Sequence, residues 1–238
     1  GWQLAEWIVD GEPTIDMLGV EPRRYGDYAS KSYLIEKNEE AYRHVFIIHY
    51  PDEEREAARP LRQAPCYDRM KSLGAVFGQK FGWERPNFFA TDGMKQEDDW
   101  SFRRSNWFKA MEKECKNVKE NVGLLDMTAF AKCRIKGPKA EEFLDNLVAN
   151  KLPKKIGRIN LCHALNTKGG VHSEFTIMRE AEDSFYLVSA GAFQRLDHDW
   201  ILKWMPNDGS VQFENLTNST GVLVVSGPKA RDLMKKVS

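Results

Sequence analysis

A short motif that joins a strand to a helix occurs twice in the chain. Residues 134–140 read RIKGPKA and residues 224–230 read VVSGPKA, and a run with helical spacing follows each copy. Glycine ends the strand, and proline in the first helical turn gives up only an amide that would have no partner there. The duplication predicts an α+β domain with internal pseudo-symmetry, since two copies are too few for a solenoid.

The residues between the two copies carry the pattern of an antiparallel sheet. Apolar and polar residues alternate over 158–165 and over 171–178, and the turn-forming sequence NTKGG separates them, which is typical of a hairpin. Residues 184–188 (SFYLV) predict a third strand, and the spacing over 193–205 predicts a helix. We therefore expect a mixed fold in which helices cover an antiparallel sheet.

The first part of the chain has a different character. Helical spacing over residues 2–9 ends near Gly11, and a second helix is predicted over 31–44. The β-rich run 45–50 (VFIIHY) predicts a short strand. Both ends of the chain fall inside helical patterns that lack caps, so we expect the chain to be an internal part of a longer polypeptide.

A domain boundary is predicted near residue 60. Prolines and charged residues alternate over 51–65, which favours a linker. We therefore divide the chain into a linker domain over 1–60 and a larger module over 61–238. The larger module begins with helices predicted over 66–73 and 107–121.

Composition excludes several classes of function. Lys plus Arg and Asp plus Glu both number 35, so no net field attracts nucleic acid, and no apolar run is long enough to cross a membrane. The four cysteines form no C-x-x-C pair, and we expect free thiols in a reducing compartment. The five histidines lack metal-site spacing, and no phosphate-binding glycine motif occurs, so we predict no metal and no dinucleotide site in these residues.

Glu174 is the first candidate for chemistry. It follows the predicted hairpin turn, and the period of two places it with His172 and Thr176 on one strand face, opposite Val171, Ser173, Phe175 and Ile177. A carboxylate on a sheet face can accept a proton from a bound amine if that face lines a cavity. A solvated strand residue is the alternative, since glutamate is seldom buried.

A second candidate is the segment 82–89 (GWERPNFF). Its three aromatic residues lie close to Arg85, and Trp83 with Arg85 could hold a flat heterocycle between an aromatic face and a guanidinium. The alternative is that Glu84 and Arg85 only attach a loop to the core, because loop polar groups also need partners.

Taken together, the sequence resembles the flavin-dependent dimethylglycine and sarcosine dehydrogenases, whose C-terminal half is related to the T-protein of the glycine cleavage system. Residues 4–13 with 22–25 are similar to the segment after the flavin domain, and residues 59–62, 74–78 and 82–87 to the start of the folate module. Residues 122–128, Gly137-Pro138 and 165–174 are similar to the T-protein core. The resemblance covers nearly the whole chain and implies a T-protein-like folate-binding module after a small linker domain.

The resemblance also implies an activity and its cofactors. In the family, FAD oxidises an N-methyl amine, and tetrahydrofolate captures the one-carbon unit. It implies that Glu174 acts on the folate amine and that Tyr186, Ser189, Trp83 and Arg85 contact the cofactor. Ser189 stands where T-proteins have asparagine, so a hydroxyl replaces an amide there.

The partners implied are a small amine substrate, folate and, for the full-length enzyme, an electron-transfer flavoprotein, with FAD bound mainly by an upstream domain. The implied location is the bacterial cytoplasm or the mitochondrial matrix. Two alternatives stay open: a non-catalytic relative of the pyruvate dehydrogenase phosphatase regulatory subunit, and a folate-dependent aminomethyltransferase. Residues 1–50, which such transferases lack, count against the second alternative.

Overall fold

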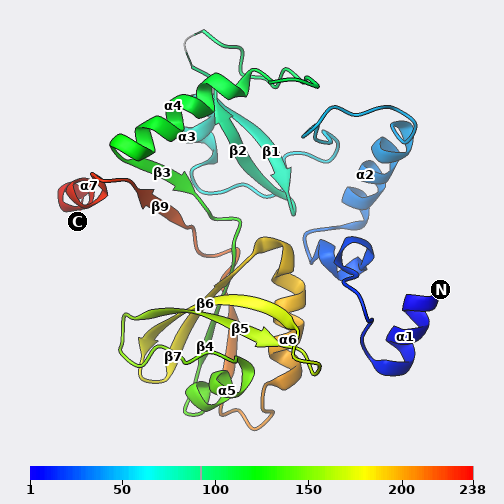
Figure 1. Cartoon of the computed structure of the whole chain (residues 1–238), viewed down its shortest axis with the longest axis vertical. Coiled ribbons are helices and arrows are strands. Elements are labelled where there is room, and N and C mark those ends of the chain that lie inside the picture. Colours follow the sequence, from blue (N-terminus) through cyan, green and yellow to red (C-terminus); the bar gives the residue numbers. More distant parts are fainter. Residues whose placement is uncertain (92, 238) are drawn as a thin grey trace. The chain divides into compact units, whose positions relative to one another are not determined.

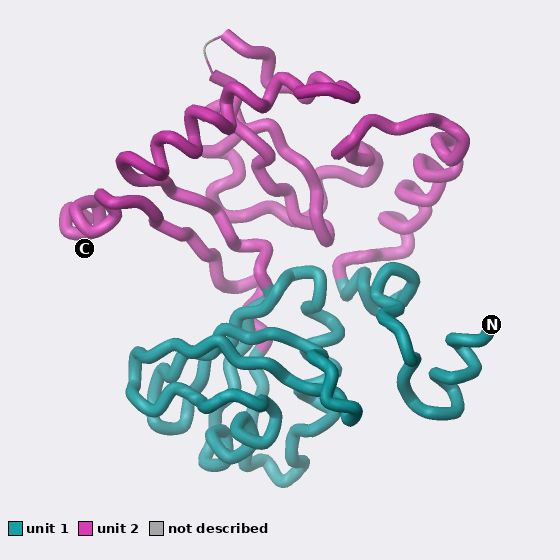
Figure 2. The backbone as a smooth tube through the Cα atoms, in the orientation of Figure 1, with its two compact units in different colours: residues 1–27, 131–214 teal, residues 28–130, 215–238 magenta. Residues whose placement is uncertain are grey.

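Each of two structural units is built from two separate stretches of chain. The computed structural model describes residues 1–91 and 93–237. Unit 1 contains residues 1–27 and 131–214, and unit 2 contains residues 28–130 and the residues from 215 onward (Figure 2). The units therefore do not coincide with two successive segments of the sequence.

A five-stranded sheet forms the centre of unit 1 (Figure 1). The strand order is β5-β6-β7-β4-β8, and the pairs β5–β6, β6–β7 and β7–β4 are antiparallel. The strands are β4 (Ala131–Lys136), β5 (Ile159–Leu165), β6 (Val171–Ala181), β7 (Ser184–Ser189) and β8 (Gln212–Asn215). The predicted hairpin and third strand are thus confirmed, and so is the antiparallel sheet.

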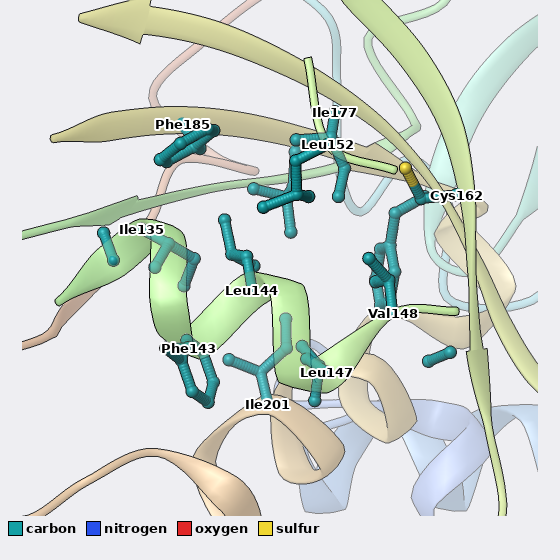
Figure 3. Close-up of a cluster of buried hydrophobic side chains, with 14 of the residues drawn as sticks. Ile135, Phe143, Leu144, Leu147, Val148, Leu152, Cys162, Ile177, Phe185 and Ile201 are labelled. Carbon is teal, nitrogen blue, oxygen red and sulfur yellow. The ribbon is translucent and has the colours of Figure 1, made fainter. Parts of the chain in front are cut away.

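Two helices cover one face of this sheet. In α5 (Ala140–Leu147) the buried residues recur at helical spacing, so Ala140, Phe143, Leu144 and Leu147 all face the sheet. Ile201 of α6 (Gln194–Trp204) joins the same core. Figure 3 shows Phe143, Leu144, Leu147 and Ile201 packed with residues from four strands, which are Ile135, Cys162, Ile177 and Phe185. Burial of this apolar surface is the main stabilising contribution in unit 1.

The N-terminal stretch of unit 1 carries short helices. They are α1 (Trp2–Asp10) and the 3-10 helices η1 (Leu18–Val20) and η2 (Pro22–Tyr25); a further one, η3 (Gly191–Phe193), precedes α6. Gly11 ends α1 with a φ of 81°, as the sequence predicted. Arg23 and Asp27 form ion pairs with Asp199 and Arg195 of α6, at 3.5 and 2.9 Å.

Unit 2 contains two small antiparallel sheets and four helices among its described residues (Figure 1). The strands are β1 (Ala75–Lys80) with β2 (Trp83–Phe89), and β3 (Gly123–Asp126) with β9 (Leu223–Ser226). The helices are α2 (Lys31–Arg43), α3 (Tyr67–Ser72), α4 (Trp107–Glu120) and α7 (Ala230–Val237). Val76, Phe88 and Ala110 form the buried cluster between β1, β2 and α4.

The predicted strand over 45–50 is wrong. The segment is irregular, and Phe46 and Ile48 are almost fully exposed. A strand needs a neighbour that accepts its backbone hydrogen bonds, and this segment has no pairing partner among the described residues. Its β-rich composition therefore did not decide its structure.

The two copies of the Gly-Pro motif adopt the same local structure. Gly137 ends β4 with a φ of 130°, and Gly227 ends β9 with a φ of 124°. The amide of Lys139 donates to the carbonyl of Ser210 at 3.3 Å, and that of Lys229 donates to the carbonyl of Asn121 at 2.9 Å. The predicted strand, turn and helix are confirmed in both copies.

Two further findings bear on the sequence predictions. The four cysteines are free, and Cys133 and Cys162 are buried in the core of unit 1. Among the described residues, no helix combines the length and the apolar character that a membrane span requires.

Candidate functional site

Glu174 lies on the face of the five-stranded sheet that is turned away from the core of unit 1. Its neighbours Ser173 and Phe175 are buried on the opposite face, and 59% of the Glu174 side chain is exposed. The predicted alternation is thus confirmed from Ser173 to Ile177. Val171 departs from it and is exposed, beside a register irregularity at Ala164 and Leu165 of the paired strand.

The surface around Glu174, called the outer face below, is largely apolar. It consists of residues that pair across β5, β6 and β7: Ile159, Leu161, His163, Glu174, Thr176, Met178, Tyr186 and Val188. Ile159 and Leu161 remain 57% and 53% exposed. Contiguous apolar surface of this kind commonly marks a place where another molecule binds. The outer face can therefore offer an apolar support with a carboxylate at its edge.

His163 is the direct partner of Glu174. The two residues are paired across β5 and β6, and His163 Nε2 lies 3.1 Å from Glu174 Oε2. On the other side of the ring, Nδ1 lies 3.2 Å from Oδ1 of Asn150. Sequence reasoning considered His163 only as a metal ligand and missed this role. Counting by two from Ile159 along β5 would have placed it on the outer face.

Tyr186 shares the outer face with Glu174. It pairs with Met178 on β6 and with Arg134 on β4, and burial raises the pKa of its hydroxyl. Arg134 in turn donates to both carboxylate oxygens of Glu180, at 2.6 and 3.1 Å. This bidentate ion pair holds the Arg134 and Glu180 side chains in fixed positions next to Tyr186.

Ser189 lies on the other face of the sheet. It is buried beside α6, where its hydroxyl and that of Ser173 hydrogen-bond the carboxylate of Asp197. Burial raises the pKa of Asp197 to about 6, and Oδ2 of that carboxylate has no hydrogen-bond partner. Burial, with a smaller contribution from Asp197, raises the pKa of Cys133 to about 12. The structure therefore does not bring Ser189 together with Glu174.

Trp83 and Arg85 belong to unit 2 and line a small, shallow hollow there. The hollow is lined by Ala64, Trp83, Glu84, Arg85, Pro86, Asp126, Thr128 and Ala129. Trp83 is buried, and the guanidinium of Arg62 lies 4.2 Å from the centre of its ring. The indole Nε1 is buried and has no hydrogen-bond partner, while Arg85 is exposed. Trp83 and Arg85 both line this small hollow, but the guanidinium that lies against the Trp83 ring is that of Arg62, so a heterocycle held between Trp83 and Arg85 stays a prediction.

The charge pair in this segment differs from the one that the sequence suggested. Glu84 is buried and pairs with Arg59, which donates to its two carboxylate oxygens at 3.0 and 2.6 Å. Arg59 also donates to the carbonyl of Phe77 at 2.9 Å. Glu84 therefore attaches residues near position 60 to the β1–β2 hairpin, and Arg85 takes no part in that attachment.

Within the described residues, no cluster of three or more potential ligands could hold a metal ion. The arrangement can nevertheless support acid-base chemistry, because the outer face carries a carboxylate in contact with an imidazole. A bound flat molecule could stack on the apolar residues while presenting an N–H group to Glu174.

Comparison with known proteins identifies two family models. Residues 66–238 match the model described as GCVT N-terminal domain, and residues 10–64 match that of the FAD dependent oxidoreductase central domain. Human mitochondrial dimethylglycine dehydrogenase is 36% identical over 240 residues, which is all of this chain and 28% of that protein. The mouse mitochondrial pyruvate dehydrogenase phosphatase regulatory subunit is 31% identical over 241 residues, which is 99% of this chain and 27% of that protein.

A solved structure shows the same fold. The crystal structure of glycine cleavage system aminomethyltransferase T from Bartonella henselae matches with a TM-score of 0.61 and 24% identity, covering 74% of this chain and 43% of that one. The predicted T-protein-like α+β fold is confirmed by this match. The chain spans less than a third of the length of both curated relatives described above.

Proposed function

Because the chain belongs to the GCVT N-terminal domain family through residues 66–238, we propose that it forms the folate-binding part of an oxidative N-demethylase. The substrate class is an N-methylated glycine, as in the name of its human relative, and tetrahydrofolate takes up the one-carbon unit that flavin-dependent oxidation releases. The observation that carries this proposal is the position of Glu174 at the edge of the apolar outer face.

The residues of the outer face suit a reduced folate. The pterin is flat and carries N–H donors, so the exposed Ile159 and Leu161 can support its ring while the Glu174 carboxylate accepts a hydrogen bond. Tyr186 lies on the same face and can contact the ring edge. In the reaction, Glu174 would accept the proton that the folate amine loses when it bonds to the one-carbon unit.

Trp83 and Arg85 belong to unit 2, so their contact with folate stays a prediction from the resemblance and carries no part of this proposal. Ser189 is left out of this proposal, because its hydroxyl is engaged with Asp197 on the buried face.

FAD does not fit the residues present. A dinucleotide site of the usual kind needs a strand, a glycine-rich turn and a helix. The segment 10–64 that matches the oxidoreductase central domain contains η1, η2 and α2 and no named strand. The sequence likewise lacks the G-x-G-x-x-G motif. We therefore assign no step of flavin chemistry to these residues, and the electron-transfer flavoprotein partner stays a prediction.

Titration calorimetry of the chain with 5-formyltetrahydrofolate, a stable reduced folate, tests the proposal. Glu174→Gln removes the charge but keeps the shape, and a hydrogen bond to a charged group contributes about 1.5–3 kcal/mol, so affinity should fall about 10- to 100-fold. Glu182→Gln, an exposed residue in the β6–β7 turn, is the matched control and should bind like the wild type. Equal affinity of the two variants would contradict a role for Glu174 in folate binding.

The regulatory alternative is favoured by one observation, the 31% identity with the mouse phosphatase regulatory subunit. The two functions differ in whether methylenetetrahydrofolate is formed. Incubating the natural protein with dimethylglycine and tetrahydrofolate distinguishes them, since a regulatory relative yields no methylenetetrahydrofolate. Both curated relatives described above carry mitochondrial names, so we propose a mitochondrial location if the source is eukaryotic.

A further inference from the structure

Three side chains in unit 1 form a connected series that ends at Glu174. Asn150 Oδ1 lies 3.2 Å from His163 Nδ1, and His163 Nε2 lies 3.1 Å from Glu174 Oε2. Asn150 is held beside β5, because the amide of Ala149 donates to the carbonyl of His163 at 2.9 Å. An antiparallel bridge between Val148 and Ala164 adds to this attachment. The position of the His163 ring is therefore set by hydrogen bonds at the backbone of the residue and at both ring nitrogens.

The orientation of the Asn150 amide follows from a second hydrogen bond. The backbone N–H of His163 donates to Asn150 Oδ1 at 2.7 Å, and a backbone N–H can only donate to the oxygen of the amide. The atom that faces His163 Nδ1 is therefore an acceptor. The atom that faces Nε2 is a carboxylate oxygen and also an acceptor when Glu174 is ionised.

Two acceptors on opposite sides of the ring decide which protonation state of the ring fits this geometry. Only an imidazolium, with a proton on each nitrogen, donates to both. If the ring loses the proton from Nε2, a hydrogen bond to Glu174 remains only when the carboxyl group itself carries a proton. At least one proton must therefore lie between Nε2 and Oε2 for the pair to remain bonded.

From this geometry we propose that His163 is a positioning residue that holds Glu174 at Oε2, keeps Oε1 free for the ligand, and shares its proton with the carboxylate. This inference rests on the proposed folate function. When the folate amine transfers its proton to Oε1, the N–H bond breaks, its electron pair stays on nitrogen, and an O–H bond forms. The proton between Oε2 and Nε2 then moves fully onto the ring, so the pair becomes an imidazolium beside a neutral carboxyl group and its net charge rises by one with the proton it has taken up.

The partial exposure of the pair supports a functional role over a structural one. The side chains of His163 and Glu174 are 33% and 59% exposed. Pairs at that level of exposure usually contribute little to folding, on the order of 1 kcal/mol or less. Removing His163 should therefore leave the fold intact, so a functional effect can be measured on folded protein.

Two substitutions separate holding the carboxylate from sharing a proton with it. His163→Gln keeps an N–H donor near the place of Nε2 but has no titratable ring, whereas His163→Ala removes both. We expect His163→Ala to lower the affinity for 5-formyltetrahydrofolate by about 10-fold, and His163→Gln to restore it to within about 3-fold of the wild type. The pH profile of the affinity should lose one ionisation in both variants. Unchanged affinity in His163→Ala, or no rescue by His163→Gln, would overturn the positioning role, and an unchanged pH profile would overturn proton sharing.

A spectroscopic readout makes the pair testable without folate. The 15N signals of the His163 ring nitrogens should change in Glu174→Gln and stay unchanged in Glu182→Gln. Ring signals that are the same in Glu174→Gln and wild type would refute the contact. If Glu174→Gln leaves folate binding intact, the proposed function fails, while the ring signals still report on the pair. If Glu174→Gln weakens binding and His163→Ala does not, only the inference about His163 fails.

Discussion

Replacing Asp197 by asparagine should remove a defined part of the pH dependence of stability. The carboxylate is 1% exposed, and burial raises its pKa from 3.8 to about 6. The folded protein therefore binds this proton more tightly than the unfolded chain does. Stability from this group is fully present below the unfolded value and is lost as the pH rises through the folded value.

The magnitude follows from the size of the shift. A displacement of about 2 pKa units corresponds to about 3 kcal/mol in total. Of this, about 2 kcal/mol should be lost between about pH 4.5 and about pH 7.5. The cause is the cost of ionising a carboxylate that receives hydrogen bonds from Ser173 and Ser189 but has an unpartnered Oδ2.

Urea unfolding of wild type and Asp197→Asn at the two pH values measures the effect. The free energy of unfolding of the variant should fall by about 2 kcal/mol less over this interval than that of the wild type. The comparison between pH values is decisive, because the new amide also places an N–H group where no acceptor exists, which lowers stability at every pH. Asp145→Asn, on the exposed side of α5, is the control and should follow the wild type. Parallel curves for Asp197→Asn and wild type would refute the buried ionisation.

Two further substitutions test the attachments described above. Arg59→Met should lower the free energy of unfolding by about 3 kcal/mol, because it leaves the buried Glu84 carboxylate without its partner. Urea unfolding measures this loss of stability, and a loss below about 1 kcal/mol would contradict the predicted role of the ion pair. Gly137→Ala should lower the free energy of unfolding by about 1–3 kcal/mol, because the φ of Gly137 is 130° and a Cβ there would collide with the Ser210 carbonyl. Gly157 also has a positive φ, but the space around it is open, so Gly157→Ala should cost less. Thermal melting of the two variants compares these costs.

The elements that the sequence predicted correctly are those in which one local pattern decides the structure. Alternation over β6 and helical spacing over α5 act within a single element, and the Gly-Pro motif fixes its own turn. The segment 45–50 shows the limit of this approach, since a strand exists only if another strand pairs with it.

The β1–β2 hairpin shows a different limit. Its two-residue turn is Phe81-Gly82, with φ values of 51° and 78°. Such a turn requires positive φ at both positions, and the usual first residue is asparagine or aspartate. Phenylalanine conceals that signal, so the sequence showed an aromatic segment but not the hairpin.

The candidate site was only partly predictable for a similar reason. Tyr186 and Ser189 are three residues apart on one strand, so the period of two places them on opposite faces. Sequence counting could therefore have separated them. The pairing of His163 with Glu174 was harder, because the register shift at Ala164 and Leu165 changes the count across the hairpin.

The repeat extends further in the structure than in the sequence. Before each Gly-Pro copy the chain forms a helix, a strand, a turn and a second strand. In each turn a side-chain oxygen accepts a hydrogen bond from the backbone N–H two residues later. The acceptor is Asp126 in the first copy, bonded by Thr128, and Asn215 in the second, bonded by Thr217. The strands then pair across the copies, because β3 of the first pairs with β9 of the second, and β4 lies beside β8. The β3–β9 sheet therefore needs one strand from each copy, whereas in the larger sheet β8 of the second copy adds to β4, which is already paired with β7. This exchange explains why the two units are each assembled from distant stretches of the chain.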